Sequence, residues 1–210
     1  MIAIIDYDAG NLTSVARAVT YLGYENVVTR DARQVLAAER IIFPGVGAAG
    51  SAMTSLKQLG MDIALHDAFQ RGIPILGICL GTQIIMKYSE ENETPCVGLV
   101  PGTVRAFSPD IRDADGARLK IPHMGWNRIE LQQEHPVLAG LKPSDEFYFV
   151  HGYYPDPLHA DHIVGKTRYG IEFASVIGYR NIIATQFHPE KSGHPGLNLL
   201  DNFCHWTPNR

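Results

Sequence analysis

The first half of the chain alternates short apolar runs with amphipathic stretches. Short apolar runs are typical of strands buried on both faces of a parallel sheet, and apolar spacings of three and four are typical of helices. This alternation predicts an α/β fold with a mostly parallel central sheet flanked by helices. The predicted strands are 1–6, 27–29, 40–43 and 73–76, and the predicted helices are 12–22, 31–39, 52–59 and 62–71.

Turn and capping residues delimit these predicted helices. A turn is expected at 8–11, and Asn11 and Asp31 can each cap the helix that follows them. Their short polar side chains can accept a hydrogen bond from a free backbone N–H of the first turn. Gly23 and Gly72 follow the ends of two helices, where glycine readily adopts a left-handed conformation.

The pattern changes after about residue 88. Polar stretches at 89–93 and 108–117 predict exposed loops, and a helix is predicted to follow Cys79 through Ile84, Ile85 and Met86. The second half is expected to add antiparallel strands to the α/β core, with turns at 101–102 and 178–181 and a closing helix at 197–206. Without repeats or a break in composition, residues 1–210 are predicted to form a single domain. The added strands are predicted at 97–100, 103–107, 119–130, 146–153, 163–166, 174–177 and 182–187.

Composition narrows the class of protein further. The 210 residues carry a net charge of −4 and are 45% hydrophobic, which is typical of a globular protein and gives no basic footprint for nucleic acid. No apolar run approaches the roughly 20 residues that span a membrane, and the N-terminus lacks a signal-peptide pattern. Three cysteines without CxxC spacing argue against a disulfide framework or a cysteine zinc site. We therefore expect a reduced, cytoplasmic protein without a metal or cofactor.

The most informative stretch is Gly77-Ile78-Cys79-Leu80-Gly81, which ends the apolar run 73–76. It has the pattern of a nucleophile elbow with cysteine in place of serine. Glycines on both sides allow a sharp turn from strand to helix, and a helix N-terminus favours the thiolate. A lone cysteine in such a turn is more often a small buried side chain, so this motif needs partners elsewhere in the chain.

Those partners follow the last predicted strand, in His188-Pro189-Glu190. Residues two apart in an extended segment lie on one face, so the imidazole and the carboxylate can point the same way. A carboxylate beside an imidazole fixes its tautomer, which is the orienting role in a catalytic triad. A strand-end histidine alone would be structural, but the two motifs together predict a nucleophile, a base and an orienting acid.

These motifs resemble the class I glutamine amidotransferases. LGICLGTQ at 76–83 and QFHPE at 186–190 are shared across that class. PGVGAAGSA at 44–52, IPHMGWN at 121–127, YFVHGYY at 148–154 and QFHPEKSG at 186–193 resemble more closely the branch that serves histidine biosynthesis. The resemblance covers essentially the whole chain and implies the flavodoxin-like sheet of that class.

The resemblance implies a glutaminase with Cys79, His188 and Glu190 as its triad. The thiolate would form a glutamyl thioester, and the oxyanion would be held by the N–H of Leu80 and by that of Val46 or Gly47. In the family the loop that carries this second donor must reorient before it can serve. Position 152 more often holds Ser or Thr in the family, which leaves a backbone contact there. The residues implied in glutamine binding are Gly47, Gln83, Glu91, Gly152 and Tyr153.

The resemblance also implies a partner for the ammonia, which in water would become unreactive ammonium. That partner is a (β/α)₈-barrel cyclase subunit forming a heterodimer, which makes imidazole glycerol phosphate and aminoimidazole carboxamide ribotide. Two alternatives stay open: the synthase partner of another class I amidotransferase, or a non-catalytic scaffold of the same fold. The intact triad residues speak against the scaffold. The residues implied at the partner interface are His123, Met124, Trp126, Asn127, Tyr148 and Lys191.

Overall fold

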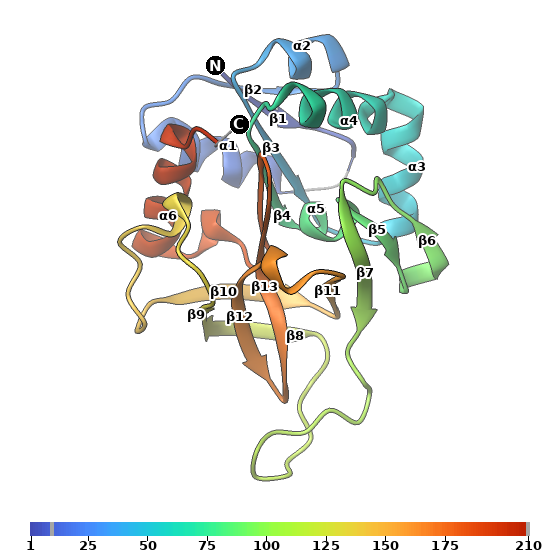
Figure 1. Cartoon of the computed structure of the whole chain (residues 1–210), viewed down its shortest axis with the longest axis vertical. Coiled ribbons are helices and arrows are strands. Elements are labelled where there is room, and N and C mark those ends of the chain that lie inside the picture. The colour runs from blue at the N-terminus through green and yellow to red at the C-terminus, as the bar shows by residue number, and fades with distance from the viewer. Residues whose placement is uncertain (9–10, 209–210) are drawn as a thin grey trace.

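A mixed eight-stranded sheet forms the centre of the molecule in the computed structural model, which describes residues 1–8 and 11–208 (Figure 1). Its order is β2-β1-β3-β4-β14-β13-β12-β9, in which the first five strands pair in parallel and the others antiparallel. The parallel part has the flavodoxin-like order with β14 as the fifth strand, which confirms the predicted fold class. The strands are β1 (Ile2–Ile5), β2 (Asn26–Thr29), β3 (Arg40–Gly45), β4 (Ile75–Cys79), β9 (Glu130–Leu131), β12 (Ile163–Tyr169), β13 (Ile171–Tyr179) and β14 (Ile182–Thr185).

Helices cover both faces of this sheet, because alternate side chains of a buried strand point to opposite faces. Ile5 and Phe43 pack on one face with α2 (Ala32–Ala37), α3 (Ala49–Leu59) and α4 (Met61–Arg71). Ile4 and Ile42 pack on the other face with α1 (Leu12–Tyr21) and α6 (Gly193–His205). The continuous apolar runs of the sequence are thus explained by burial on both sides.

The predicted caps and bounds of the helices are confirmed only in part, since α3 begins at Ala49 rather than at 52 and α6 at Gly193 rather than at 197. Asp31 caps α2 by accepting a hydrogen bond from the N–H of Arg33 at 2.9 Å, and Gly72 ends α4 in the left-handed conformation, as predicted. Asn11 precedes α1 but accepts from the hydroxyl of Ser14 rather than from a backbone N–H, so its predicted capping bond is wrong. Residues 9 and 10 of the predicted turn at 8–11 lie outside the described residues.

Two small sheets lie beside the central one. One pairs β8 (His123–Arg128) with β10 (Glu146–His151), and the other has the order β11-β7-β5-β6. The loop between β7 and β8 projects away from the helices, as expected for 108–117 (Figure 1). The second small sheet consists of β5 (Met86–Ser89), β6 (Thr94–Pro95), β7 (Val100–Ala106) and β11 (Tyr153–Pro157), and short 3₁₀ turns are η1 (Glu91–Glu93), η2 (Pro136–Leu138), η3 (Ala160–His162) and η4 (Pro189–Lys191).

Several predicted elements differ from the structure. Residues 97–99 and 119–122 lie outside the strands predicted at 97–100 and 119–130, since β7 begins at Val100 and β8 at His123. The helix after Cys79, α5 (Leu80–Ile84), is short, and Met86 begins a strand because it pairs with Val100 of β7. The predicted turn at 101–102 lies inside β7, where Gly102 allows β11 to approach: a Cβ there would lie 2.5 Å from the carbonyl oxygen of Asp156. The strand predicted at 146–153 is two strands, since the chain passes from one small sheet to the other at Gly152.

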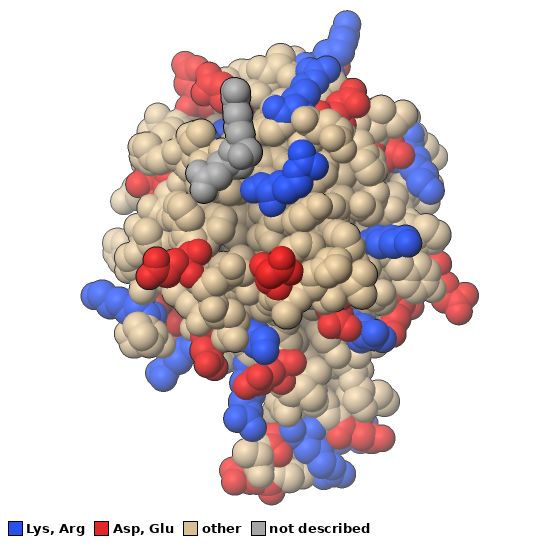
Figure 2. All heavy atoms as spheres, in the orientation of Figure 1, with Lys and Arg blue, Asp and Glu red and all other residues tan. Residues whose placement is uncertain are grey.

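Charged side chains are scattered over the molecule. On the face drawn in Figure 2, acidic and basic residues are interspersed, without a stripe of one sign. In the described part of the chain, none of the helices is both long and apolar enough to cross a membrane.

Candidate active site

Cys79 is the last residue of β4 and the start of α5, in a backbone conformation that non-glycine residues rarely adopt (φ 54°, ψ −107°). The flanking glycines make this turn possible. A Cβ on Gly77 would lie 2.9 Å from Cβ of Ala184, and a Cβ on Gly81 would overlap the carbonyl oxygen of Phe43. The side chain is therefore held at the helix N-terminus and at the carboxyl end of the central sheet, with 6% of Cys79 exposed.

His188 and Glu190 lie together directly after β14. Nδ1 of His188 is 2.7 Å from Oε1 of Glu190, and both side chains are almost fully buried. The backbone of His188 is held on both sides: its N–H donates to the carbonyl of Tyr148 at 2.9 Å, and its carbonyl accepts from the hydroxyl of Ser192 at 2.6 Å. This arrangement leaves Nε2 of His188 free to face the thiol of Cys79.

The charge state of His188 reflects its two neighbours. Burial acts to lower its pKa, but interactions with Cys79 and Glu190 outweigh burial and raise the pKa to about 9. Nε2 makes no well-formed hydrogen bond, although it is close enough to Cys79 for the two groups to interact. An imidazolium beside a thiol favours the thiolate, the nucleophilic form.

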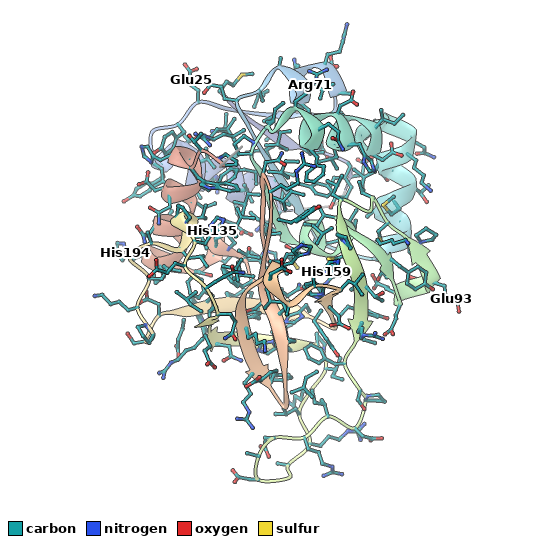
Figure 3. All side chains as sticks on the ribbon, in the orientation of Figure 1. Glu25, Arg71, Glu93, His135, His159 and His194 are labelled. Atoms are coloured by element: carbon teal, nitrogen blue, oxygen red, sulfur yellow. The ribbon has the colours of Figure 1, made fainter. Side chains whose placement is uncertain are left out.

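The other two cysteines have a different environment. Burial raises the pKa of Cys96 to about 11 and that of Cys204 to about 12. Both thiols are therefore neutral near pH 7. Three of the remaining histidines, His135, His159 and His194, come from separate segments (Figure 3).

Gln186 is a neighbour of the sulfur that the sequence reasoning missed. Its Nε2 lies 3.8 Å from Sγ of Cys79, and its Oε1 accepts from Nε2 of Gln83 at 3.1 Å. The available signal was its position two residues before His188 in an extended segment, which places both side chains on one face. Val150 was also missed: its carbonyl oxygen lies 3.9 Å from the same sulfur.

The residues expected to bind glutamine fall into two groups. Gln83 donates from Nε2 to the carbonyl of Tyr153 at 3.0 Å, which joins it to the turn at Gly152 and to Cys79 through Gln186. Glu91 lies apart from them: its Oε2 accepts from the N–H of Ala49, the first residue of α3, at 2.7 Å.

The segment 44–47 starts beside the nucleophile, because Gly45 pairs with Cys79 in the register of β3 and β4. Val46 is 39% exposed, and Gly47 has a φ of 102° that favours glycine. Within the described part of the chain, the N–H groups of Val46 and Gly47 donate to no protein acceptor. Leu80, whose N–H is the other expected oxyanion donor, is the first residue of α5.

A chain of hydrogen bonds connects this site to β8. Nδ1 of His151 lies 2.8 Å from the carbonyl oxygen of Tyr153, and Nε2 of His151 lies 3.0 Å from Nδ1 of His123. A carbonyl can only accept, so His151 carries its hydrogen on Nδ1 and accepts at Nε2 from His123. Nε2 of His123 is then left to accept from the amide of Asn127 at 3.3 Å. The sequence reasoning missed His151.

Most residues expected at a partner interface lie on one face. Met124 and Trp126 of β8 are 62% and 55% exposed, and the ring of Trp126 lies 6.0 Å from that of Tyr148. Nζ of Lys191 lies 5.8 Å from the centre of the Tyr148 ring. His123 and Asn127 point to the other side of β8 from Met124 and Trp126, because successive residues of a strand point to opposite sides. The side chain of His123 is buried there, stacked on Tyr169 and Phe149.

Comparison with known proteins agrees with this geometry. The family model "Glutamine amidotransferase class-I" matches residues 3–206. The chain is 50% identical over 203 residues to imidazole glycerol phosphate synthase subunit HisH of Nitratidesulfovibrio vulgaris (strain DP4), covering 97% of this chain and 95% of that protein. It is 44% identical over 207 residues to subunit HisH 1 of Pseudomonas aeruginosa, covering 98% and 96%.

Solved structures show the same fold at low sequence identity. A crystal structure of a glutamine amidotransferase matches with a TM-score of 0.72 and 18% identity, over 97% of this chain and 100% of that one. PurLQS from Thermotoga maritima matches with a TM-score of 0.71 and 15% identity, over 97% of both chains. With a family model that spans nearly the whole sequence, the chain belongs to the class I glutamine amidotransferase family.

Proposed function

We propose that this chain is the glutaminase subunit of an imidazole glycerol phosphate synthase, with residues 1–210 acting as one amidotransferase domain. The observation that carries the proposal is the strained elbow at Cys79 facing the buried His188–Glu190 pair. The close similarity to HisH subunits supports the choice of synthase. Three free cysteines are compatible with a reducing, cytoplasmic location.

In the first half of the proposed reaction, Cys79 attacks the side-chain amide of glutamine. His188 takes the thiol proton at Nε2, while Glu190 accepts the hydrogen bond from Nδ1 and stabilises the imidazolium. The sulfur–carbon bond forms and the carbonyl π electrons move to oxygen, giving an oxyanion. When the carbon–nitrogen bond breaks, His188 returns the proton to nitrogen, so ammonia leaves and a glutamyl thioester remains.

The oxyanion needs donors aimed at it from the start. We assign one to the N–H of Leu80 at the start of α5 and the other to Val46 or Gly47, whose N–H groups are uncommitted within the described residues. Gln83 would contact glutamine through Oε1, because its Nε2 is already held by Tyr153 and Gln186.

The remaining glutamine contacts are assigned to Gly47, Gly152 and Glu91. The backbone at Gly152 adjoins the Tyr153 carbonyl that holds Gln83. The carboxylate of Glu91 suits an ammonium group, and its anchoring at the start of α3 keeps it near the segment 44–47.

In the second half, water takes the place of ammonia. His188 accepts a proton from water as the oxygen attacks the thioester, and the carbon–sulfur bond then breaks to release glutamate and the thiolate. The ammonia passes to a cyclase subunit of (β/α)₈-barrel fold. Exposed aromatic and sulfur-containing side chains favour protein interfaces, so we assign the docking face to Met124, Trp126, Tyr148 and Lys191. His123 and Asn127, hydrogen-bonded to each other on the other side of β8, support this face from behind.

The test is glutamine hydrolysis by the full chain, alone and with a barrel cyclase and its nucleotide substrate. Replacing Cys79→Ser should lower hydrolysis by at least about 10³-fold, because the nucleophile is lost. Synthesis from added ammonium salts by the complex should continue. A diazo-ketone analogue of glutamine should label the wild-type chain at Cys79.

The matched control is Cys204→Ser, which replaces a thiol of raised pKa in α6, outside the site, and should leave hydrolysis unchanged. A wild-type chain that neither hydrolyses glutamine nor reacts with the analogue, even with its cyclase present, would contradict the proposed function. Equal stimulation by the synthase partner of another class I amidotransferase would contradict the choice of cyclase.

A further inference from the structure

Tyr7 is a buried residue for which the proposed reaction has no role. It follows β1 at the carboxyl end of the parallel strands, and its side chain is fully buried. Its hydroxyl has no hydrogen-bond partner among the described residues. A buried hydroxyl without a partner destabilises the folded chain, and phenylalanine at this position would avoid that cost. We therefore expect the hydroxyl to find a hydrogen-bond partner in another conformation of the protein.

The surroundings of this hydroxyl identify the segment that could supply the partner. A Cβ on Gly45 would overlap the hydroxyl, which therefore lies against the backbone of Gly45. The ring of Tyr7 packs on Phe43 of the same strand, with ring centres 5.3 Å apart. Because Gly45 pairs with Cys79, the hydroxyl lies at the start of the segment 44–47, beside the nucleophile.

Peptide geometry indicates that the segment 44–47 needs one further hydrogen-bond donor during the reaction. In a trans peptide the N–H and the C=O point in opposite directions. If the N–H of Val46 turns toward the oxyanion beside Cys79, the carbonyl of Gly45, in the same peptide group, must turn away from it. A buried carbonyl needs a donor, and the hydroxyl against Gly45 has an uncommitted hydrogen.

The hydroxyl is also in the right protonation state to donate. Burial, and secondarily the charge of Cys79, raise the pKa of Tyr7 far above its usual range. The group remains a neutral O–H when the nearby thiolate forms.

We propose that Tyr7 is a positioning residue, whose hydroxyl donates a hydrogen bond to the carbonyl of Gly45 when the Val46 N–H faces the oxyanion of bound glutamine. This inference rests on the proposed function of the site. It gives the catalytic arrangement of the segment 44–47 a hydrogen bond that the resting arrangement lacks, and it requires glycine at position 45 to leave room for the hydroxyl.

The test is Tyr7→Phe in the full chain, assayed in complex with the barrel cyclase. Loss of one buried hydrogen bond made in the transition state should lower kcat for glutamine hydrolysis about tenfold, with KM within about twofold. The urea midpoint should stay equal or rise, because the hydroxyl has no partner in the resting protein. A loss of activity without a loss of stability is not expected from a packing role.

The matched control is Tyr24→Phe, which removes a hydroxyl bonded to Oδ1 of Asp201 at 2.6 Å, remote from Cys79. Its urea midpoint should fall while kcat is unchanged. A wild-type kcat in Tyr7→Phe, or a midpoint that falls as far as in Tyr24→Phe, would overturn the inference. If the wild-type chain does not hydrolyse glutamine, the proposed function itself has failed.

A second measurement needs no variant that might fail to fold. An aldehyde analogue of glutamine adds the Cys79 thiol to its carbonyl carbon and so carries an oxygen at the oxyanion position. In the full chain labelled with ¹³Cζ-tyrosine, the Tyr7 resonance should shift when this adduct forms. A Tyr7 resonance that is unchanged in the adduct would also overturn the inference.

Discussion

Two groups of buried polar side chains lie at or beside the candidate active site and differ in how they are partnered. In the first group, each ring nitrogen of His123 and His151 has a partner, in a chain that runs from Asn127 to the carbonyl of Tyr153. In the second, the hydroxyl of Tyr7, Nε2 of His188 and Oε2 of Glu190 have none within the described residues. Among the side chains that the structure describes, one further buried atom lacks a partner: Nδ1 of His162, whose ring packs against Tyr179.

This difference separates atoms that hold the structure from atoms that are kept free for reaction. A fully bonded buried network stabilises one arrangement of the chain, and breaking it leaves costly unpaired groups. An unpartnered buried atom lowers stability and is retained where a substrate or a moving segment supplies its partner. The comparison predicts that changes in the first group act mainly on stability, and changes in the second mainly on catalysis.

The largest expected effect is that of Glu190→Gln in the second group. Glutamine can still accept from Nδ1 of His188 but lacks the charge that supports the imidazolium, so kcat for glutamine should fall on the order of 10³-fold. The pKa of His188, now raised to about 9, should fall, which an NMR titration can measure. Exposed Glu25→Gln is the control and should change neither quantity. An unchanged pKa of His188 in Glu190→Gln would contradict the catalytic role given to the second group.

A smaller effect should follow from acid acting on the first group. Burial lowers the pKa of His123 to about 4, and burial above all lowers that of His151 to about 3, against about 6.5 in the unfolded chain. The unfolded chain therefore binds protons first, so this contribution to stability is present above pH 6.5 and is lost as the pH falls toward 4 and then 3. Between pH 6.5 and 5 each residue should contribute a loss of at most about 2 kcal/mol.

Urea unfolding at pH 7 and pH 5 measures this loss. The double variant His123→Phe/His151→Phe should be less stable at pH 7 but should lose less stability on going to pH 5. Burial also lowers the pKa of His135 to about 4, so His135 contributes part of the pH dependence of the unfolding free energy in both proteins. An equal loss of stability between pH 7 and pH 5 in the wild type and the double variant would show that His123 and His151 do not cause the pH dependence.

The smallest expected effect lies at the outer end of the network, in Asn127→Ala. This change removes the hydrogen bonds from Nδ2 to Nε2 of His123 and to the carbonyl of Arg168, and should cost about 0.5–1.5 kcal/mol of unfolding free energy. The ¹⁵N shift of His123 Nε2 should change as well. Asn198→Ala removes a bond to the carbonyl of Ala139 at an exposed site and should leave that shift unchanged. An unaltered His123 signal in Asn127→Ala would remove Asn127 from the network.

The parallel core could be predicted from the sequence, because its signals are local. Apolar runs buried on both faces, the cap at Asp31 and the glycine at 72 each act within a few residues. The elements after Cys79 were harder to predict, because they depend on pairing between segments that are distant in the sequence. Met86 continues a helical pattern, yet it becomes a strand because a distant segment, β7, pairs with it. The break at Gly152 likewise depends on which sheet accepts each half of the run.

The proximity of the candidate site residues was predictable in part, because Cys79 and His188-Pro189-Glu190 carry their own motifs. Gln186 could have been added from its spacing, since it lies two residues before His188. Tyr7 and His151 could not have been identified in this way. Their importance comes from a missing hydrogen bond in one case and from a fixed tautomer in the other, and neither property belongs to a residue type or a spacing.

The sequence by itself determined the alternation that builds the parallel sheet and the glycines that permit a strained cysteine at the end of a strand. Both follow from the backbone preferences and hydrophobicity of neighbouring residues. Only the tertiary structure decided which buried polar atoms are paired and which are left free around Cys79. Desolvation and hydrogen bonding depend on what surrounds an atom in space, and those surroundings come from segments far apart along the chain.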